Sequence, residues 1–126
     1  MSPVPPSPAK SGSVLDESAL ARLRELDPDG RHGVLARVLA AYETSLVRML
    51  ALLRAERLAP NPKAVAALAH TLKSSSASVG ALALASACAA LEQCVRQEAT
   101  AQTHDVDELI ALGEAALAAV RTILRG

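Results

Sequence analysis

Between residues 35 and 53, apolar side chains recur at steps of three and four positions, the spacing of an amphipathic α-helix. Charged residues such as Arg37 and Glu43 fall outside this apolar stripe. The chain of 126 residues has no Phe or Trp and one Tyr, so its core must consist mainly of aliphatic side chains. Because such a helix must bury its stripe against other elements, the pattern favours a helical bundle. The stripe comprises Leu35, Val38, Leu39, Tyr42, Leu46, Met49, Leu50 and Leu53.

Local signals mark the first three helices. Asp16 is a candidate N-cap for a short helix that ends near Leu26, and the turn sequence 27–30 (Asp-Pro-Asp-Gly) then precedes the long helix. Asn61 and Pro62 suit the N-cap and first position of the next helix, which we expect to run to about Val79.

Two further helices follow. Gly80 tolerates positive φ and predicts a turn, after which apolar positions resume along a fourth long segment (Leu84, Cys88, Leu91 and Val95). The polar residues 100–104 form another break, and Asp105 is a candidate cap for a final helix that reaches the carboxyl end.

These segments predict an all-α fold, an antiparallel four-helix bundle with a short additional N-terminal helix. Short connections favour antiparallel neighbours, with helices three and four as a hairpin, and no segment alternates like a strand. Residues 1–13 are rich in Pro and Ser and are predicted to be a disordered linker or tail, whereas residues 14–126 form the folded domain.

Composition excludes several functional classes. The formal net charge is zero and aromatic residues make up 1% of the chain, which argues against nucleic-acid binding. No apolar run is long enough to span a membrane, and residues 1–13 lack the apolar stretch of a secretory signal. We therefore expect a cytoplasmic, monomeric domain without direct membrane insertion.

The cysteines and two of the histidines show no pattern of a metal or redox site. Cys88 and Cys94 lie on different faces of one predicted helix, so we expect both to be reduced, with Cys88 in the core and the role of Cys94 open. His32 and His104 have no ligand-spaced partners and are expected at the surface. We predict no metal site.

His70 is the strongest candidate for chemistry. On a helix, Lys73 and Ser74 share its face, whereas Leu68 and Leu72 lie on the opposite side. A solvent-facing imidazole with one cation a turn away suits a nucleophile that another protein approaches. The three serines that follow His70 lack the strand-to-helix Gly-x-Ser-x-Gly turn of a serine hydrolase, so we expect them to be small surface or packing residues.

The stretch from Ala69 to Arg96 resembles the signature of the histidine-containing phosphotransfer (HPt) domain family. The matching residues are His70, Leu72, Lys73, Ser75, Ser76, Val79, Gly80, Ala81, Leu84, Cys88, Leu91 and Glu92. Members of this family are four-helix bundles that relay phosphoryl groups between receiver domains in bacterial, fungal and plant signalling. The resemblance thus implies an HPt bundle over residues 14–126.

The resemblance also implies roles for individual residues. His70 would be the phosphoacceptor and Lys73 would stabilise phosphoryl charge. Glu92 would accept a hydrogen bond from Nδ1 of His70, with Gln93 as the alternative acceptor. Arg96 would assist docking, although an ordinary ion pair with Glu92 explains it equally well.

Small side chains around His70 would form the surface on which a partner docks. They are Ala66, Ala67, Ser74 and Ala77. The family usually has Gly where Ser74 stands, so this departure bears on how closely a partner approaches. A second departure is the lack of Phe in the long helix, which bears on stability.

We therefore expect a phosphoryl carrier rather than a self-contained enzyme, which accepts the group from a receiver phosphoaspartate and passes it to a response-regulator receiver. No cofactor is expected in this domain, and the receiver would supply Mg²⁺. The Pro-rich lead favours the C-terminal module of a bacterial hybrid sensor histidine kinase, tethered through that parent to the inner membrane, although a free-standing protein would look the same. The alternative function is a noncatalytic helical adaptor.

Overall fold

The computed structural model describes residues 14–126, and the predicted tail, residues 1–13, lies outside the described part. Residues 14–126 form five helices and no strand, which confirms the all-α prediction. The helices are α1 (Glu17–Glu25), α2 (Val34–Ala55), α3 (Pro62–Ser78), α4 (Leu82–Glu98) and α5 (Thr103–Arg125).

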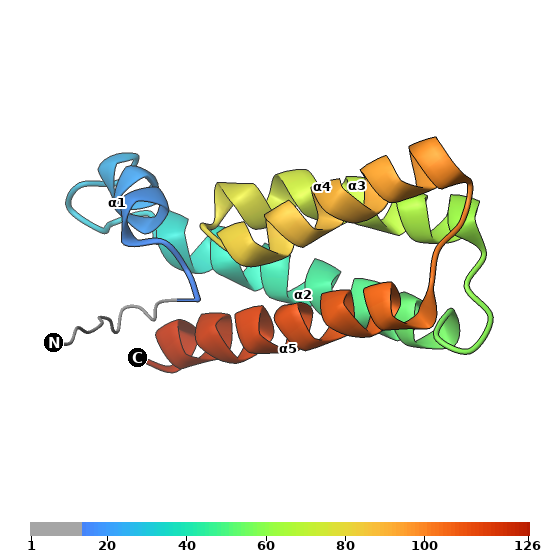
Figure 1. Cartoon of the computed structure of the whole chain (residues 1–126). Coiled ribbons are helices and arrows are strands. Elements are labelled where there is room, and N and C mark those ends of the chain that lie inside the picture. Colours follow the sequence, from blue (N-terminus) through green and yellow to red (C-terminus); the bar gives the residue numbers. More distant parts are fainter. Residues whose placement is uncertain (1–13) are drawn as a thin grey trace, which may run out of the picture.

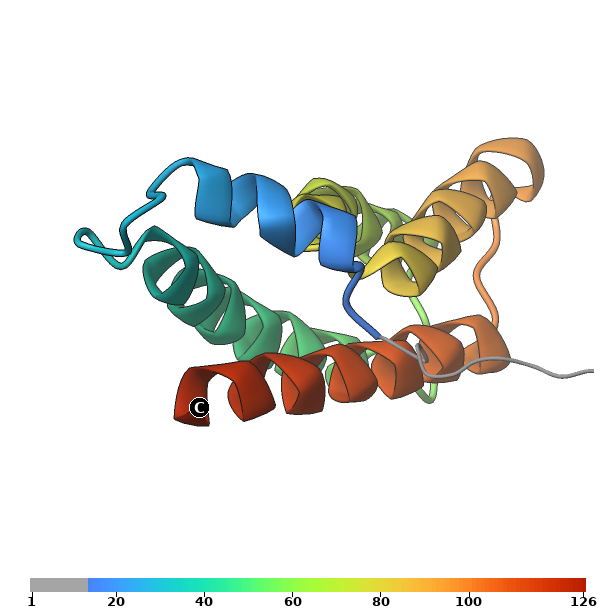
Figure 2. The ribbon, with the colours of Figure 1, turned by 90° about the vertical axis from the view of Figure 1, so that its left-hand side faces the viewer.

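The four long helices lie in two layers. Helices α3 and α4 form an antiparallel hairpin on one side, and α2 and α5 pack beneath them (Figure 1). The short α1 lies at the end of the bundle where the chain turns from α3 to α4 (Figures 1 and 2). The hairpin is therefore covered on one face by α2 and α5, which leaves its other face open to solvent.

Side chains near three helix starts explain where those helices begin. The Asp16 carboxylate accepts from the N–H of Ala19 at 3.1 Å, as the sequence predicts. The Asn61 side-chain oxygen likewise accepts from the N–H groups of Lys63 and Ala64 at the start of α3. At the start of α5 the predicted cap, Asp105, is wrong, because Gln102 is the N-cap. Asp105 is instead the third residue of the helix, and its carboxylate accepts a hydrogen bond from the N–H of Gln102 to complete a capping box.

The start of α2 has a cap that the local sequence pattern does not predict. Gly33 occupies the N-cap position in a left-handed conformation with φ 60°, and it has no side chain that can accept a hydrogen bond. The carboxylate of Asp27, buried in the preceding loop, accepts instead from the N–H groups of His32 and Val34. This bonding orders the loop between α1 and α2 and explains how an acidic residue can be buried there.

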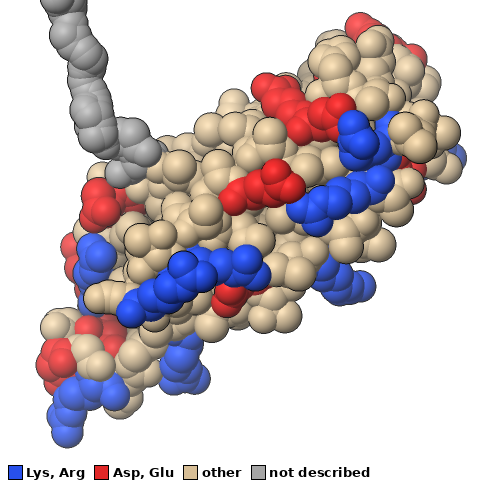
Figure 3. Space-filling view, turned by 90° about the horizontal axis from the view of Figure 1, so that it is seen from below, with Lys and Arg blue, Asp and Glu red and all other residues tan. Residues whose placement is uncertain are grey.

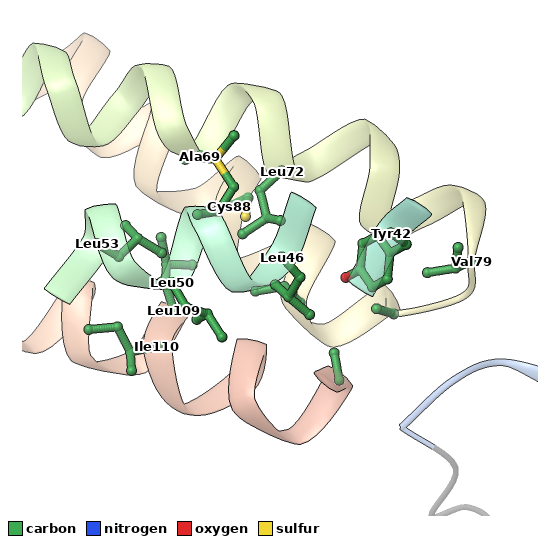
Figure 4. Close-up of a cluster of buried hydrophobic side chains, with 14 of the residues drawn as sticks. Tyr42, Leu46, Leu50, Leu53, Ala69, Leu72, Val79, Cys88, Leu109 and Ile110 are labelled. Atoms are coloured by element: carbon green, nitrogen blue, oxygen red, sulfur yellow. The ribbon is translucent and has the colours of Figure 1, made fainter. Parts of the chain in front are cut away.

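Aliphatic side chains from all five helices fill the core. Leu46, Leu50 and Leu53 of α2 point between the hairpin and α5 (Figure 4). Cys88 of α4 is fully buried beside Leu72, which confirms its predicted place in the core. The aliphatic core is thus continuous without Phe or Trp.

One buried polar pair crosses the core between α2 and α3. The hydroxyl groups of Tyr42 and Ser76 lie 2.8 Å apart, and Ser76 is fully buried. Burial raises the pKa of Tyr42, so its hydroxyl stays protonated. Ser76 was predicted to be a small surface or packing residue, and the structure adds a hydrogen bond to that packing role.

The register of α2 against α5 is marked by ion pairs at the surface. Glu43 pairs with Arg121 and Arg54 with Glu114, and Arg57, which lies two residues beyond the end of α2, pairs with Asp107. As the residue number rises along α2 it falls along α5, so the two helices are antiparallel. The face seen from the α5 side accordingly carries acidic and basic side chains next to one another (Figure 3). Such exposed pairs contribute little stability each, but together they favour one register.

The turn between α3 and α4 sets the register of the hairpin. Gly80 has φ 84°, as the sequence predicts for this turn, and its carbonyl accepts from the N–H of Asp16 at 2.8 Å. A Cβ atom at Gly80 would lie 2.6 Å from that same nitrogen. The turn therefore needs glycine both for its backbone conformation and for the close approach of the segment that leads into α1.

Candidate functional site

His70 projects from the middle of α3 on the open face of the hairpin. Its side chain is 71% exposed, whereas Ala69 and Leu72 on the same helix are buried in the core. The apolar residues of α3 thus hold the helix in place and direct the imidazole outward, as the helical spacing predicts. A partner can reach this ring without any opening of the bundle.

Glu92 of α4 contacts one nitrogen of the His70 ring. Its Oε2 lies 2.9 Å from Nδ1 of His70, although the two residues are 22 positions apart in the sequence. The antiparallel hairpin brings them to the same level, because the tight turn at residues 79–81 returns α4 alongside α3. The Glu92 side chain is 10% exposed, so the carboxylate is largely covered where it bridges the two helices.

Lys73 contacts the other oxygen of the same carboxylate. Its Nζ lies 2.6 Å from Oε1 of Glu92, and its side chain is 36% exposed. The Lys73 ammonium lowers the pKa of Glu92, and the hydrogen bond with His70 acts in the same direction, while burial opposes both. Glu92 is therefore ionised at neutral pH. The sequence places Lys73 near His70, but it does not reveal that the ammonium rests on Glu92.

The ionised carboxylate determines the roles of the two ring nitrogens. A carboxylate can only accept hydrogen bonds, so in the neutral ring Nδ1 carries the proton and donates it to Glu92. Nε2 then holds the free lone pair of the exposed ring. The site is therefore arranged for nucleophilic attack by Nε2, with the positive charge that forms on the ring stabilised by Glu92.

Gln93, the alternative acceptor predicted from the sequence, does not contact His70. Its side-chain oxygen accepts from Nη1 of Arg96 at 2.6 Å, and both side chains are exposed. Successive residues on a helix differ in direction by about 100°, so only one of Glu92 and Gln93 can point toward His70. Arg96 is consequently paired with Gln93 and forms no ion pair with Glu92.

The four small residues expected to surround His70 lie where the helical spacing predicts. Ala67, Ser74 and Ala77 are exposed and Ala66 is half-buried. The sequence interpretation did not include Ala89, which is exposed on α4 one turn before Glu92 and extends this small-residue surface onto the second helix. Helical spacing puts Ala89 on the same face of α4 as Glu92, but the sequence does not define how that face is aligned with His70.

The remaining cysteines and histidines are not organised for chemistry. Burial raises the pKa of Cys88 to about 12, so its thiol is protonated, and the pKa of half-buried Cys94 is raised as well. His32 and His104 are exposed, and His104 is not isolated, because its Nε2 lies 3.1 Å from Asp105.

The residues that the structure describes lack two further features. Residues 14–126 contain no group of three or more His, Cys, Asp or Glu side chains placed to hold a metal ion. None of their helices combines the length and the apolar character needed to cross a membrane.

Comparisons with known proteins identify the family of the chain. The family model described as "Hpt domain" matches residues 34–123, which include His70, Lys73 and Glu92. No curated protein matches the chain. Among solved structures, the chain is similar to histidine-containing phosphotransfer protein B from Pseudomonas aeruginosa PAO1, with a TM-score of 0.68 and 28% sequence identity over 88% of this chain and 90% of that one. The chain therefore belongs to the Hpt domain family, the histidine-containing phosphotransfer intermediates of phosphorelays.

Proposed function

We propose that His70 is the residue that carries the phosphoryl group, accepting it from the phosphoaspartate of one receiver domain and passing it to the aspartate of another. The observation that supports this most directly is the pairing of an exposed imidazole with a largely buried, ionised carboxylate at Nδ1. A noncatalytic adaptor surface has no physical need for that pairing.

In the proposed transfer, the lone pair of Nε2 attacks phosphorus as the bond between phosphorus and the receiver carboxylate oxygen breaks. The carboxylate leaves with the bonding electrons, and the phosphorylated ring becomes cationic while Nδ1 keeps its proton. Glu92 balances that cation across the 2.9 Å contact. The reverse sequence returns the group to a receiver aspartate, so the same site serves both directions of transfer.

The domain supplies the nucleophile, and the receiver is proposed to supply the Mg²⁺ ion and the second reacting carboxylate. Lys73 is proposed to add positive charge near the transferred group, one helical turn from His70. Ala66, Ala67, Ser74 and Ala77 are proposed to form the docking surface, because small side chains let the receiver backbone approach closely. Arg96 is proposed to contact the receiver at the edge of this surface.

The test is a transfer assay with phosphorylated receiver domains. The intact domain, a His70→Gln variant and a His104→Gln variant are each mixed with a receiver that carries labelled phosphate, and the label on each domain is followed over time. We expect the intact domain and His104→Gln to be labelled at similar rates and His70→Gln to remain unlabelled. The label should be lost in acid, as is typical of phosphorus bound to an imidazole nitrogen.

His104→Gln is the matched control because both imidazoles are exposed and each lies beside a carboxylate. Equal labelling of His70→Gln and the intact domain would show that the phosphoacceptor is another residue. Binding of receivers without any labelling of the intact domain would instead favour the adaptor function.

A further inference from the structure

Four serines lie in the second half of α3, and one of them differs from the others in what its hydroxyl group binds. The hydroxyl of Ser76 is bonded in the core, and those of Ser75 and Ser78 donate to carbonyl groups of the helix at 3.2 Å and 3.0 Å. The hydroxyl of Ser74 makes no such bond within residues 14–126, and the residue is exposed. Ser74 therefore presents an unused hydrogen-bonding group to solvent.

Helical geometry places Ser74 beside His70, on the side away from Glu92. Each residue along a helix advances by about 100°, so Lys73 is displaced from His70 by about 60° in one direction and Ser74 by about 40° in the other. Lys73 contacts Glu92 at 2.6 Å, so its direction is that of α4. Because Nδ1 of His70 also contacts Glu92, Nε2 is the ring nitrogen farther from α4. Ser74 is the polar residue one turn away on that side.

The Ser74 hydroxyl is suited to a group attached to Nε2 of His70. Residues four apart on a helix have Cβ atoms about 5–6 Å apart, and the tilt of helical side chains directs Ser74 toward the turn that carries His70. A phosphoryl group on Nε2 adds three oxygen atoms that accept hydrogen bonds. A serine hydroxyl can donate to one of them.

We propose that the hydroxyl of Ser74 donates a hydrogen bond to an oxygen of the phosphoryl group on Nε2 of His70, which makes Ser74 part of the binding site for that group. This inference rests on the proposed function of His70. It gives Ser74 a role in the phosphorylated domain after the receiver has left, in addition to its role in docking. The bond lowers the free energy of the phosphorylated form, so the domain holds a larger share of the phosphoryl group at equilibrium.

An equilibrium measurement separates this role from the effect of side-chain size on docking. The bulk of Ser74 changes how closely a receiver approaches, and so it changes the rates of transfer in both directions. The equilibrium between separate domains does not depend on the complex that they form in passing. A change in helix propensity also cancels, because it is the same in the phosphorylated and unphosphorylated forms. A shift in the equilibrium therefore reports a contact with the phosphoryl group.

In the experiment, the intact domain and a Ser74→Ala variant with an added size tag compete for labelled phosphate through a small amount of one receiver domain. The receiver moves the group between the two, and the label on each is followed until their ratio is constant. We expect the intact domain to hold about 2- to 10-fold more label than an equal amount of Ser74→Ala, the factor that one hydrogen bond of ordinary strength provides. The ratio should be the same whichever domain carries the label at the start.

Two further variants and a control complete the test. Ser74→Gly also lacks the hydroxyl, so it should lose the same share of label as Ser74→Ala although it leaves the surface more open. Ser74→Thr keeps a hydroxyl and should hold about as much label as the intact domain. Ser78→Ala is the matched control, because it removes another exposed serine hydroxyl of α3 at a position two turns from His70, and it should leave the ratio at one.

Equal label on the intact domain and on Ser74→Ala would overturn the proposal. The movement of label between the two domains would still demonstrate phosphoryl transfer, so that result would leave the proposed function intact. Failure of the intact domain to take up any label would instead overturn the proposed function, and this inference with it.

Discussion

At the scale of single residues, the site depends on the Glu92 carboxylate, which stays charged although only 10% of its side chain is exposed to solvent. Burial alone would favour the protonated form of Glu92. The Lys73 ammonium outweighs that effect and lowers the pKa of Glu92. The exposed imidazole can therefore rely on a charged acceptor without having to be buried with it.

This arrangement predicts how stability responds to acid. Because the pKa of Glu92 is lower in the folded protein than its unfolded value of about 4.3, the ionised contact stabilises the fold above that value and is lost as the pH falls through the folded pKa. Glu92→Gln should therefore be less stable than the intact protein at pH 7. The difference in melting temperature should shrink as the pH is lowered from about 5 to about 2.

Thermal unfolding followed by circular dichroism at several pH values provides the measurement. Glu108→Gln is the control, because it removes an exposed carboxylate from α5 and changes the formal net charge by the same amount as Glu92→Gln. Its effect on the melting temperature should be small throughout. If the melting temperature of Glu92→Gln lay as far below that of the intact protein at pH 2 as at pH 7, this would contradict the ionic role of Glu92.

At the scale of elements, the turn between α3 and α4 decides which residues of the hairpin meet. Gly80 combines a positive φ with a backbone contact to Asp16, so the turn is tied to the start of α1 as well as to its own two helices. A shift of this turn by one residue would rotate Glu92 away from His70 by about 100°. The geometry of the site therefore rests on a glycine ten residues from the histidine.

Replacement of this glycine should be more damaging than replacement of a glycine in an open loop. Gly80→Ala places a Cβ 2.6 Å from the nitrogen of Asp16 in addition to straining φ, and we expect a loss of about 2–5 kcal/mol in the free energy of unfolding. Gly30→Ala strains φ at 71° but meets no atom within 4 Å, so it should cost about 1–2 kcal/mol. Urea denaturation measures both.

The difference between the two alanine variants isolates the cost of the close approach, because both positions have a positive φ. Equal losses for Gly80→Ala and Gly30→Ala would show that the segment leading into α1 moves aside freely. In that case the turn would not depend on its contact with Asp16.

At the scale of the whole molecule, contacts between aliphatic side chains have no preferred direction, so they do not by themselves fix how the helices are aligned. The Tyr42–Ser76 hydrogen bond does require one alignment of α2 against α3. It joins α2 to α3 inside a core made otherwise of apolar side chains. A buried polar group left without a partner destabilises the fold, so α2 and α3 can slide past one another only at that cost.

A double-mutant cycle tests this coupling. Tyr42→Phe should cost about 1 kcal/mol, since the Ser76 hydroxyl can turn to a carbonyl of its own helix. Ser76→Ala leaves the Tyr42 hydroxyl buried without its partner and should cost about 1–3 kcal/mol. The double variant should be more stable than the sum of the single losses implies, by about 1 kcal/mol, in urea denaturation. Additive losses would mean that the two hydroxyl groups act independently.

Much of this molecule follows from local patterns in its sequence. The apolar periodicity predicts the helices, Asp16 and Asn61 predict two of the helix starts, and Gly80 predicts the turn, because each signal acts within a few residues along the chain. The exposure of His70 also follows, since helical spacing separates it from its buried neighbours. For the same reason the sequence predicts the small residues that surround His70.

What only the tertiary structure decided are the contacts between residues far apart in the sequence. The choice of Glu92 over Gln93, the pairing of Lys73 with Glu92, and the bond between Tyr42 and Ser76 all depend on how helices are rotated and aligned against each other. Periodicity defines which face of each helix is buried, but it does not define the register between faces. That register is set by packing, by the Gly80 turn and by the α2–α5 ion pairs acting together, which no local pattern contains.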